Sequence, residues 1–98
     1  MLTLLSVKET PAGDSKKYVA FFSDGTSVKF GAKGYSDYTV HRDKKRRDRY
    51  RARHAKDNLN DLKSPGALSW YLLWGESTSL QQNIAAYKRR MANAHHSN

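Results

Sequence analysis

Residues 16–30, KKYVAFFSDGTSVKF, decide the fold, because two segments rich in β-branched and aromatic residues flank an Asp-Gly pair. This pair, Asp24 and Gly25, is the strongest short signal for a β-hairpin, since glycine adopts the positive φ that a tight turn requires. The sequence therefore predicts two antiparallel strands, over residues 16–22 and 26–31.

The alternation of apolar residues in the first of these strands predicts which side chains reach the core. Successive side chains of a strand point to opposite faces of the sheet. We therefore expect Tyr18, Ala20 and Phe22 on one face and Val19 and Phe21 on the other.

The segments on either side of the hairpin extend the fold. LTLLSV, residues 2–7, predicts a further strand. Residues 31–40 carry two glycines within four residues, which indicates an irregular connection shaped by a tight turn. Residues 43–58 lack glycine and proline and are mostly good helix formers, which predicts a helix, with Asp37 or Asp43 as its N-cap.

Two more helices are predicted in the last third of the chain. Ser64 and Pro65 have the order of an N-cap and a first helical residue, and they introduce the short apolar helix ALSWYLLW at 67–74. A last helix should begin after Ser77 or Thr78. Its apolar residues recur at helical spacing and form one face, at Leu80, Ile84, Tyr87 and Met91.

The length of 98 residues predicts one small domain. We expect an α+β fold over residues 1–92, in which a three-stranded antiparallel sheet with a hairpin is followed by about three helices. Residues 93–98 are polar and are expected to form a flexible tail. A domain of this size buries only ~60 to 70 % of the surface of its unfolded chain, so the core is modest.

The charge of the chain is concentrated in one place. The formal net charge is +9, from 18 Lys and Arg against 9 Asp and Glu. Residues 42–56 hold nine of these cations and only two carboxylates. The cations are Arg42, Lys44, Lys45, Arg46, Arg47, Arg49, Arg51, Arg53 and Lys56.

On a helix these cations surround most of the circumference, because 3.6 residues make one turn. Repulsion between like charges at i and i+4 costs a few tenths of a kcal/mol per pair. We therefore expect the basic block to meet an anion, either phosphate or protein carboxylate. Arginine outnumbers lysine six to three in this block, and its planar fork suits either partner.

Five aromatic residues stand near the basic block. Tyr35, Tyr38 and Tyr50 either present rings to single-stranded nucleic acid or pack against the sheet and the last helix, and we favour packing. Trp70 and Trp74 lie four residues apart on one helical face. They belong to the core or form an apolar docking patch for a neighbouring protein.

The sequence contains no set of residues typical of catalysis. His41, Arg42 and Asp43 match the HRD tripeptide of kinases, but position 48 is not the required asparagine and the chain is too short for that fold. The GAKG stretch, 31–34, lacks the spacing of a Walker loop and is interpreted as a turn. We expect no enzymatic activity, no small-molecule substrate and no cofactor.

Metal and membrane sites are not expected either. The chain has no cysteine, and its adjacent histidines, His95 and His96, lie in a polar segment. The apolar run at the start is too short for a signal peptide, and no stretch approaches the ~20 apolar residues of a membrane span.

The order of several motifs resembles a family of short, basic, uncharacterised proteins of nucleocytoplasmic large DNA viruses, with members in algal viruses and mimivirus relatives. The resemblance covers roughly residues 20 to 90. It rests on the sequences VKFG, KGYSDYT, HRD, RYRARH, WYLLW and YKRR, at 28–31, 33–39, 41–43, 49–54, 70–74 and 87–90.

The resemblance implies a small basic protein encoded by a virus, with no assigned activity. We expect a non-enzymatic virion component, a minor capsid protein whose Arg-rich helix bridges neighbouring capsid or other virion proteins. Such a protein would be located in the capsid, and during assembly in the host cytoplasm or virus factory. The alternative is a nucleic-acid-binding protein that contacts phosphates without sequence preference.

Overall fold

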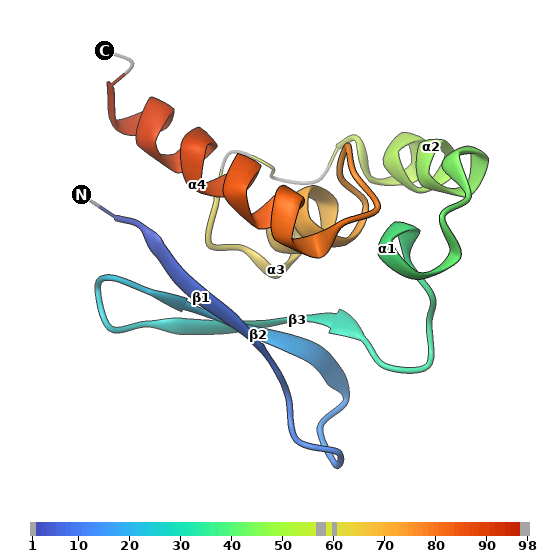
Figure 1. Cartoon of the computed structure of the whole chain (residues 1–98), viewed down its shortest axis with the longest axis horizontal. Helices are drawn as coiled ribbons and strands as arrows, with labels where there is room; N and C mark the ends of the chain where they lie inside the picture. The colour runs from blue at the N-terminus through green and yellow to red at the C-terminus, as the bar shows by residue number, and fades with distance from the viewer. Residues whose placement is uncertain (1, 57–58, 60, 97–98) are drawn as a thin grey trace.

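The sheet of the protein is antiparallel, as predicted. The structure is a computed structural model that describes residues 2–56, 59 and 61–96 (Figure 1). Its strands follow in the spatial order β1, β2, β3, and span Leu4–Glu9, Lys16–Phe22 and Ser27–Ala32. The helices follow the sheet in the chain, so the predicted α+β class is confirmed.

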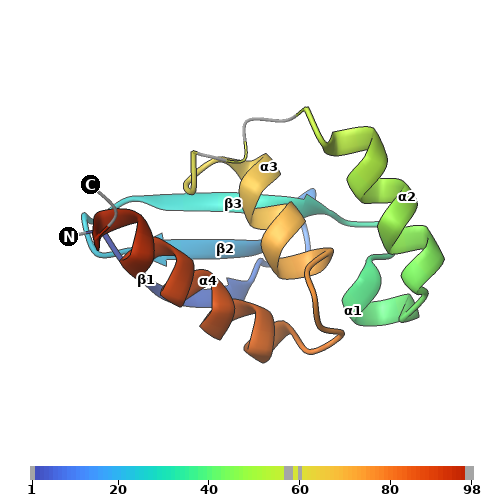
Figure 2. The same ribbon diagram turned by 90° about the horizontal axis from the view of Figure 1, so that it is seen from above.

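Within residues 33–56, 59 and 61–96, the structure has four α-helices and one π-helical segment. They are α1 (Tyr38–His41), α2 (Lys44–His54), α3 (Pro65–Leu68), η1 (Ser69–Leu73) and α4 (Leu80–His96). In Figures 1 and 2, α3 and α4 lie over one face of the sheet, whereas α1 and α2 lie beyond its end.

The hairpin forms at the Asp-Gly pair. Gly25 has φ +86°, and the backbone N–H of Phe22 donates to the carbonyl of Thr26 at 2.9 Å. The register pairs Tyr18 with Phe30 and Ala20 with Val28. β1 begins and ends two residues later than predicted. It extends to Glu9 because its polar residues Lys8 and Glu9 still pair with β2, and its register is irregular between Leu4 and Ser6.

The core lies between the covered face of the sheet and the helices. It contains Ala20, Phe22 and Phe30 of the sheet, each at most 2 % exposed. The helices contribute Leu68, Leu72, Leu73, Tyr87 and Met91. The predicted faces of β2 are therefore correct, and Phe21 is exposed on the uncovered side.

The connection between the sheet and α2 contains an unpredicted helical turn. Asp37 accepts a hydrogen bond from the backbone N–H of Thr39 at 2.9 Å and caps α1, where the sequence indicated an irregular segment. Asp43 caps α2 by accepting from the N–H groups of Lys45 and Arg46. Of the two candidate caps of the basic helix, Asp43 is therefore confirmed, whereas Asp37 caps α1, which a two-residue junction separates from α2.

Three helix boundaries differ from the prediction. α2 ends at His54, earlier than predicted, and residues 57 and 58 lie outside the described residues. The hydroxyl of Ser79 accepts from the N–H of Gln82 at 3.3 Å, so Ser79 precedes α4 where Ser77 or Thr78 was expected. α4 continues to His96, through most of the segment predicted as a tail.

The apolar helix starts as predicted and then widens. Ser64 caps α3 through the N–H of Ala67, and Pro65 occupies its first turn. In η1, the N–H of Trp74 donates to the carbonyl of Ser69 at 3.1 Å, which is the i to i+5 spacing of a π-helix. Such segments often mark functional sites, and this one carries the aromatic residues that α2 contacts.

Candidate functional site

The inner face of α2 is polar and aromatic. Arg47, Tyr50, Arg51 and His54 follow the spacing of one helical stripe and are the least exposed residues of the helix. The alanines of α2 and its C-cap, Ala52 and Ala55, are exposed. A helix with this inner face is held by hydrogen bonds and ring contacts instead of aliphatic burial.

Arg47 is the most buried cation of the basic block. Its side chain is 10 % exposed and lies over the ring of Tyr38, with 5.1 Å between Cζ and the ring centroid. Nη2 donates to a carboxylate oxygen of Asp48 at 2.9 Å, and Nη1 donates to the carbonyl of Gly75 at 3.4 Å. Arg47 therefore serves the fold and is not available to an external anion.

Arg51 holds the same end of η1. Its Nε donates to the carbonyl of Trp74 at 2.9 Å, and its guanidinium lies 4.9 Å from the ring centroid of Trp70. Nη1 also lies 3.4 Å from a carboxylate oxygen of Glu76. The last carbonyls of a helix lack donors within it and carry partial negative charge. The two inner arginines therefore complete the carboxyl end of η1 from a different helix.

A ring stack joins α2 to the segment that follows η1. The rings of Tyr50 and Trp74 are almost parallel, at an interplanar angle of 5° and a centroid distance of 4.2 Å. The ring of His41 lies 5.3 Å from Trp74. Trp70 and Trp74 are thus half-buried, and each has a ring contact with α2 of the same chain. The docking patch considered from the sequence stays a prediction.

His41 links this stack to the cap of α2. The backbone N–H of Asp43 donates to Nδ1 of His41 at 2.8 Å, so the ring is neutral in this geometry. Its Nε2 is buried and has no hydrogen-bond partner among the described residues. Burial of the ring, reinforced by the charge of Arg46, lowers the pKa of His41 below its usual range.

The remaining cations of the basic block point to solvent. We call them the cation face: Arg42, Lys44, Lys45, Arg46, Arg49, Arg53 and Lys56. None of them forms an ion pair with a carboxylate within the described ranges 2–56, 59 and 61–96. The carboxylate of the nearby Asp43 accepts hydrogen bonds from backbone N–H groups of α2. The bond from the N–H of Arg46 contributes most to lowering the pKa of Asp43 below its usual range.

Arg42 occupies an unusual backbone position within this face. Its φ of 59° and ψ of 26° place it in the left-handed region, and it is the only residue other than glycine with positive φ in the described chain. This conformation costs of order 1 kcal/mol or more for a residue with a Cβ atom. It ends α1 and turns the chain into α2, so the cation face begins at a sharp corner.

A groove of about 470 Å³ borders the cation face. Arg46 and Arg53 line one side of it, and the other side is formed by the end of β3 and the following loop, including Tyr35. Trp74 and the first turn of α3 contribute to its walls. Tyr35 is 75 % exposed and is the most exposed of the large hydrophobic residues described.

The acidic residue of this groove is already neutralised. Asp37 is 2 % exposed, and its carboxylate lies 2.7 Å from Nζ of Lys17. The groove also contains Lys16, so its lining has four cations against this one carboxylate. The site is therefore positive next to an exposed aromatic ring.

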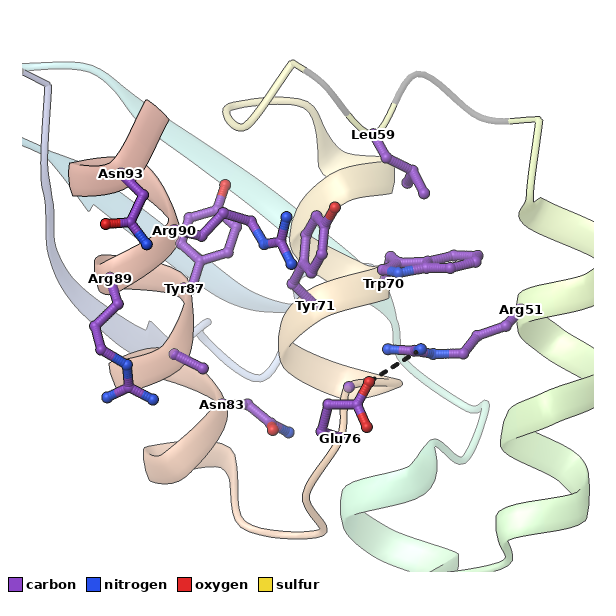
Figure 3. A pocket seen from close by; sticks show the side chains of 12 residues that line it. Arg51, Leu59, Trp70, Tyr71, Glu76, Asn83, Tyr87, Arg89, Arg90 and Asn93 are labelled. Atoms are coloured by element: carbon purple, nitrogen blue, oxygen red, sulfur yellow. Dashed lines mark hydrogen bonds and ion pairs between the residues drawn. The ribbon is translucent and has the colours of Figure 1, made fainter. Parts of the chain in front are cut away.

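A second groove lies on the other side of the contact between α2 and η1. Its volume is about 680 Å³, and it runs between α4, η1 and α2 (Figure 3). The guanidinium of Arg90 covers the ring of Tyr71 at 4.4 Å, as that of Arg51 covers Trp70. One face of each of these two rings is therefore covered by a guanidinium of the protein.

The structure thus separates the predicted site residues into two groups. Seven of the nine cations are exposed, whereas Arg47 and Arg51 face inward. Tyr50 packs on Trp74 and Tyr38 lies under Arg47, but the favoured packing interpretation is wrong for the exposed Tyr35. The inward arginines are missed from sequence because a uniform basic run does not indicate which positions face carbonyl groups.

The described part of the chain contains neither a cluster of metal ligands nor a membrane-spanning helix. Among these residues no group of three or more His, Cys, Asp and Glu is arranged to hold a metal ion. No helix in the same ranges is long and apolar enough to span a membrane.

Comparison with known proteins gives one match. Residues 8–54 match a family of unknown function, DUF5754. No curated protein and no solved structure matches the chain. The matched region is just under half of the chain and runs from β1 to the last residue of α2. The matched region includes Tyr35 and the residues of the cation face up to Arg53. It does not include Trp70, Trp74 or α4.

Proposed function

We propose that the protein binds nucleic acid through the cation face, with phosphate as the recognised group and little dependence on base sequence. The observation that carries this proposal is the division of the basic block. Two arginines serve the fold, whereas seven cations are exposed and have no carboxylate partner among the described residues.

The spacing of the exposed arginines supports the proposal. Arg46, Arg49 and Arg53 lie at i, i+3 and i+7 and therefore form one stripe along α2. Repulsion between these like charges costs a few tenths of a kcal/mol per pair. A bound anion offsets this repulsion, because it places negative charge between the cations. Release of counterions from a polyanion adds a favourable term for every phosphate neutralised.

The test is the salt dependence of binding to labelled duplex DNA, measured by fluorescence anisotropy. Neutralisation of five to eight phosphates predicts a slope of log K against log salt of about −4.5 to −7. Replacing Arg46, Arg49 and Arg53 together by alanine should make this slope less steep by about three units. Substitutions at these exposed positions should change the unfolding free energy by less than about 0.5 kcal/mol each.

The matched control removes the same charge elsewhere. Lys8 lies on β1, and Lys88 and Arg89 are exposed on α4, outside the cation face. Their joint replacement by alanine lowers the net charge equally and should leave the slope nearly unchanged. Equal loss of slope in both triple variants would show a general charge effect, and absence of binding at ~50 mM salt would contradict the proposal.

A second candidate is a virion structural role, with protein carboxylates as the partners of the cation face. One observation favours it beyond the resemblance to viral proteins. The uncovered face of the sheet presents Leu5, 58 % exposed, and Phe21, 37 % exposed, as apolar contacts for a neighbouring capsid subunit. A minor capsid protein should be recovered in purified particles, cross-linked to capsid subunits through α2 or this face.

Polyglutamate distinguishes the two candidates. A nucleic-acid-binding protein should bind DNA more tightly than polyglutamate of equal charge at the same salt concentration, because arginine forks can contact each phosphate in a fixed backbone spacing. Equal or tighter binding of polyglutamate would favour carboxylate partners.

A further inference from the structure

We infer that the ligand of the cation face is single-stranded nucleic acid, and that an unpaired base stacks on Tyr35 in the groove beside α2. This inference rests on the proposed function, because the phosphates next to that base are those held by the cation face. It adds a binding site and a preference for single strands, which a charged helix alone does not provide.

The exposure of Tyr35 is the first observation. Its side chain is 75 % exposed, although the protein has few large apolar residues outside the core. It has no ring or cation contact with any residue of the described ranges, in contrast to Tyr38, Tyr50 and Tyr71. A tyrosine in this position contributes little to folding, and its ring is available to a flat partner.

The position of Tyr35 is the second observation. It lines the same groove as Arg46 and Arg53, on the side opposite α2. These two arginines lie seven positions apart in α2, which corresponds to about 10 Å along the helix axis. A strand that follows this edge of α2 can place phosphates on the arginines and turn an unpaired base toward the ring.

The loop that carries Tyr35 is fixed at both ends. On its N-terminal side, Gly34 has φ +88° and lies in the turn after β3, where the N–H of Tyr35 donates to the carbonyl of Ala32 at 3.4 Å. On its C-terminal side, Asp37 caps α1 and pairs with Lys17 of β2 at 2.7 Å. These contacts hold the backbone on both sides of an exposed ring, so stacking does not require the whole loop to become ordered.

Single strands are favoured over duplex for a physical reason. A stacking platform needs a base whose face is free, and the bases of a duplex already stack on their neighbours. Aromatic platforms next to a positive groove bind single strands with little sequence preference, because every base has a π-face. The cation face alone would bind duplex at least as well, because duplex has the higher charge density.

The experiment compares Tyr35→Ala and Tyr35→Phe with the unmodified protein. The probes are a labelled oligothymidine of about 12 nucleotides and a duplex of equal length, at matched salt. Tyr35→Ala should weaken oligothymidine binding by about 5- to 100-fold, and Tyr35→Phe should retain it, because stacking needs the ring and not the hydroxyl. Duplex binding should change by less than about twofold in either variant.

Leu5→Ala provides the matched control, because Leu5 is an exposed apolar residue on a strand far from the groove in the chain. This variant should bind both probes as the unmodified protein does. Thermal unfolding should show that all three variants are folded, since both positions are exposed.

A second measurement locates the base directly. An oligonucleotide that contains 5-iodouracil should, on irradiation, cross-link to the peptide that contains Tyr35, as identified by mass spectrometry. Unchanged oligothymidine affinity in Tyr35→Ala, or equal affinity of the unmodified protein for single strand and duplex, would overturn the inference and leave the phosphate proposal standing. If the unmodified protein binds neither probe, both the inference and the proposed function are overturned.

Discussion

At the scale of single residues, the functional division of this protein lies between arginines of identical chemistry. Arg47 and Arg51 direct their guanidinium groups to backbone carbonyls at the end of η1, whereas Arg46 and Arg49 are exposed. A hydrogen bond from a charged group contributes about 1.5 to 3 kcal/mol, while an isolated exposed charge contributes little. Neighbouring arginines of one basic helix therefore differ: Arg47 and Arg51 stabilise the fold, whereas Arg46 and Arg49 contribute little to it.

His41 should make the stability of the protein depend on pH. Burial lowers the pKa of the folded-state imidazole below the value of about 6.5 expected in the unfolded chain. Arg46 and Lys17 lower it further, whereas Asp43 and Asp37 oppose the shift. The unfolded chain thus binds more protons, so stability from this group is present above pH ~6.5 and is lost as the pH falls through the folded pKa.

The test compares urea unfolding at pH 7.5 and pH 5 for the unmodified protein and for His41→Asn. Asparagine retains an acceptor for the N–H of Asp43 but does not titrate. The free energy of unfolding should fall more on acidification in the unmodified protein than in the variant. An equal fall in both proteins would exclude His41 as a source of the pH dependence.

At the scale of elements, the close approach of β3 and η1 fixes how the helices sit on the sheet. Gly31 in β3 has φ +75°, and a Cβ atom there would lie 2.8 Å from Cδ1 of Leu73. Leu73 is 2 % exposed and belongs to the core. Leu73 therefore packs directly on the backbone of β3, at a position where the strand carries no side chain.

Three glycine variants separate the contributions at this junction. Gly31→Ala adds both backbone strain and a clash and should lower the free energy of unfolding by about 2 to 4 kcal/mol. Gly34→Ala, with φ +88° and open space, adds strain alone and should cost about 1 to 2 kcal/mol. Gly13→Ala has neither feature and should change stability by less than about 1 kcal/mol. Chemical denaturation tests the order, and equal effects at Gly31 and Gly34 would show that Leu73 moves aside freely.

At the scale of the whole molecule, the protein consists of a packed body and a helix held at its edge. The sheet, α3, η1 and α4 supply the core residues, whereas α2 lies beyond the end of the sheet and buries only Arg47 (Figure 2). Local stability follows the buried apolar contacts of each segment. The cation face therefore lies on the less strongly packed of the two long helices.

Hydrogen exchange should reveal this difference. Amides in the second half of α2 should exchange through local opening, at a lower free energy than amides of β2 near Ala20 and Phe22. Addition of oligothymidine should slow exchange in α2 and leave β2 unchanged. Equal protection of α2 and β2 in the free protein would mean that the polar and ring contacts of α2 are as strong as the apolar core.

The sequence by itself determined the local features of this protein. The hairpin at Asp24 and Gly25, the caps at Asp43 and Ser64, and the apolar faces follow from turn chemistry and periodicity, which act over a few residues. The concentration of charge in residues 42–56 is likewise readable from composition. These features suffice for the α+β class and for the region of the candidate site.

Only the tertiary structure decided which residues of that region are free to bind. The roles of Arg47, Arg51 and Trp74 depend on carbonyls and rings more than twenty positions away in the chain, and periodicity contains no information on such partners. For Tyr35 the sequence favoured packing, and only the placement of the sheet, α1 and α2 shows that its ring is exposed beside a groove. Burial is a property of the packed chain, so the division between structural and binding residues appears only there.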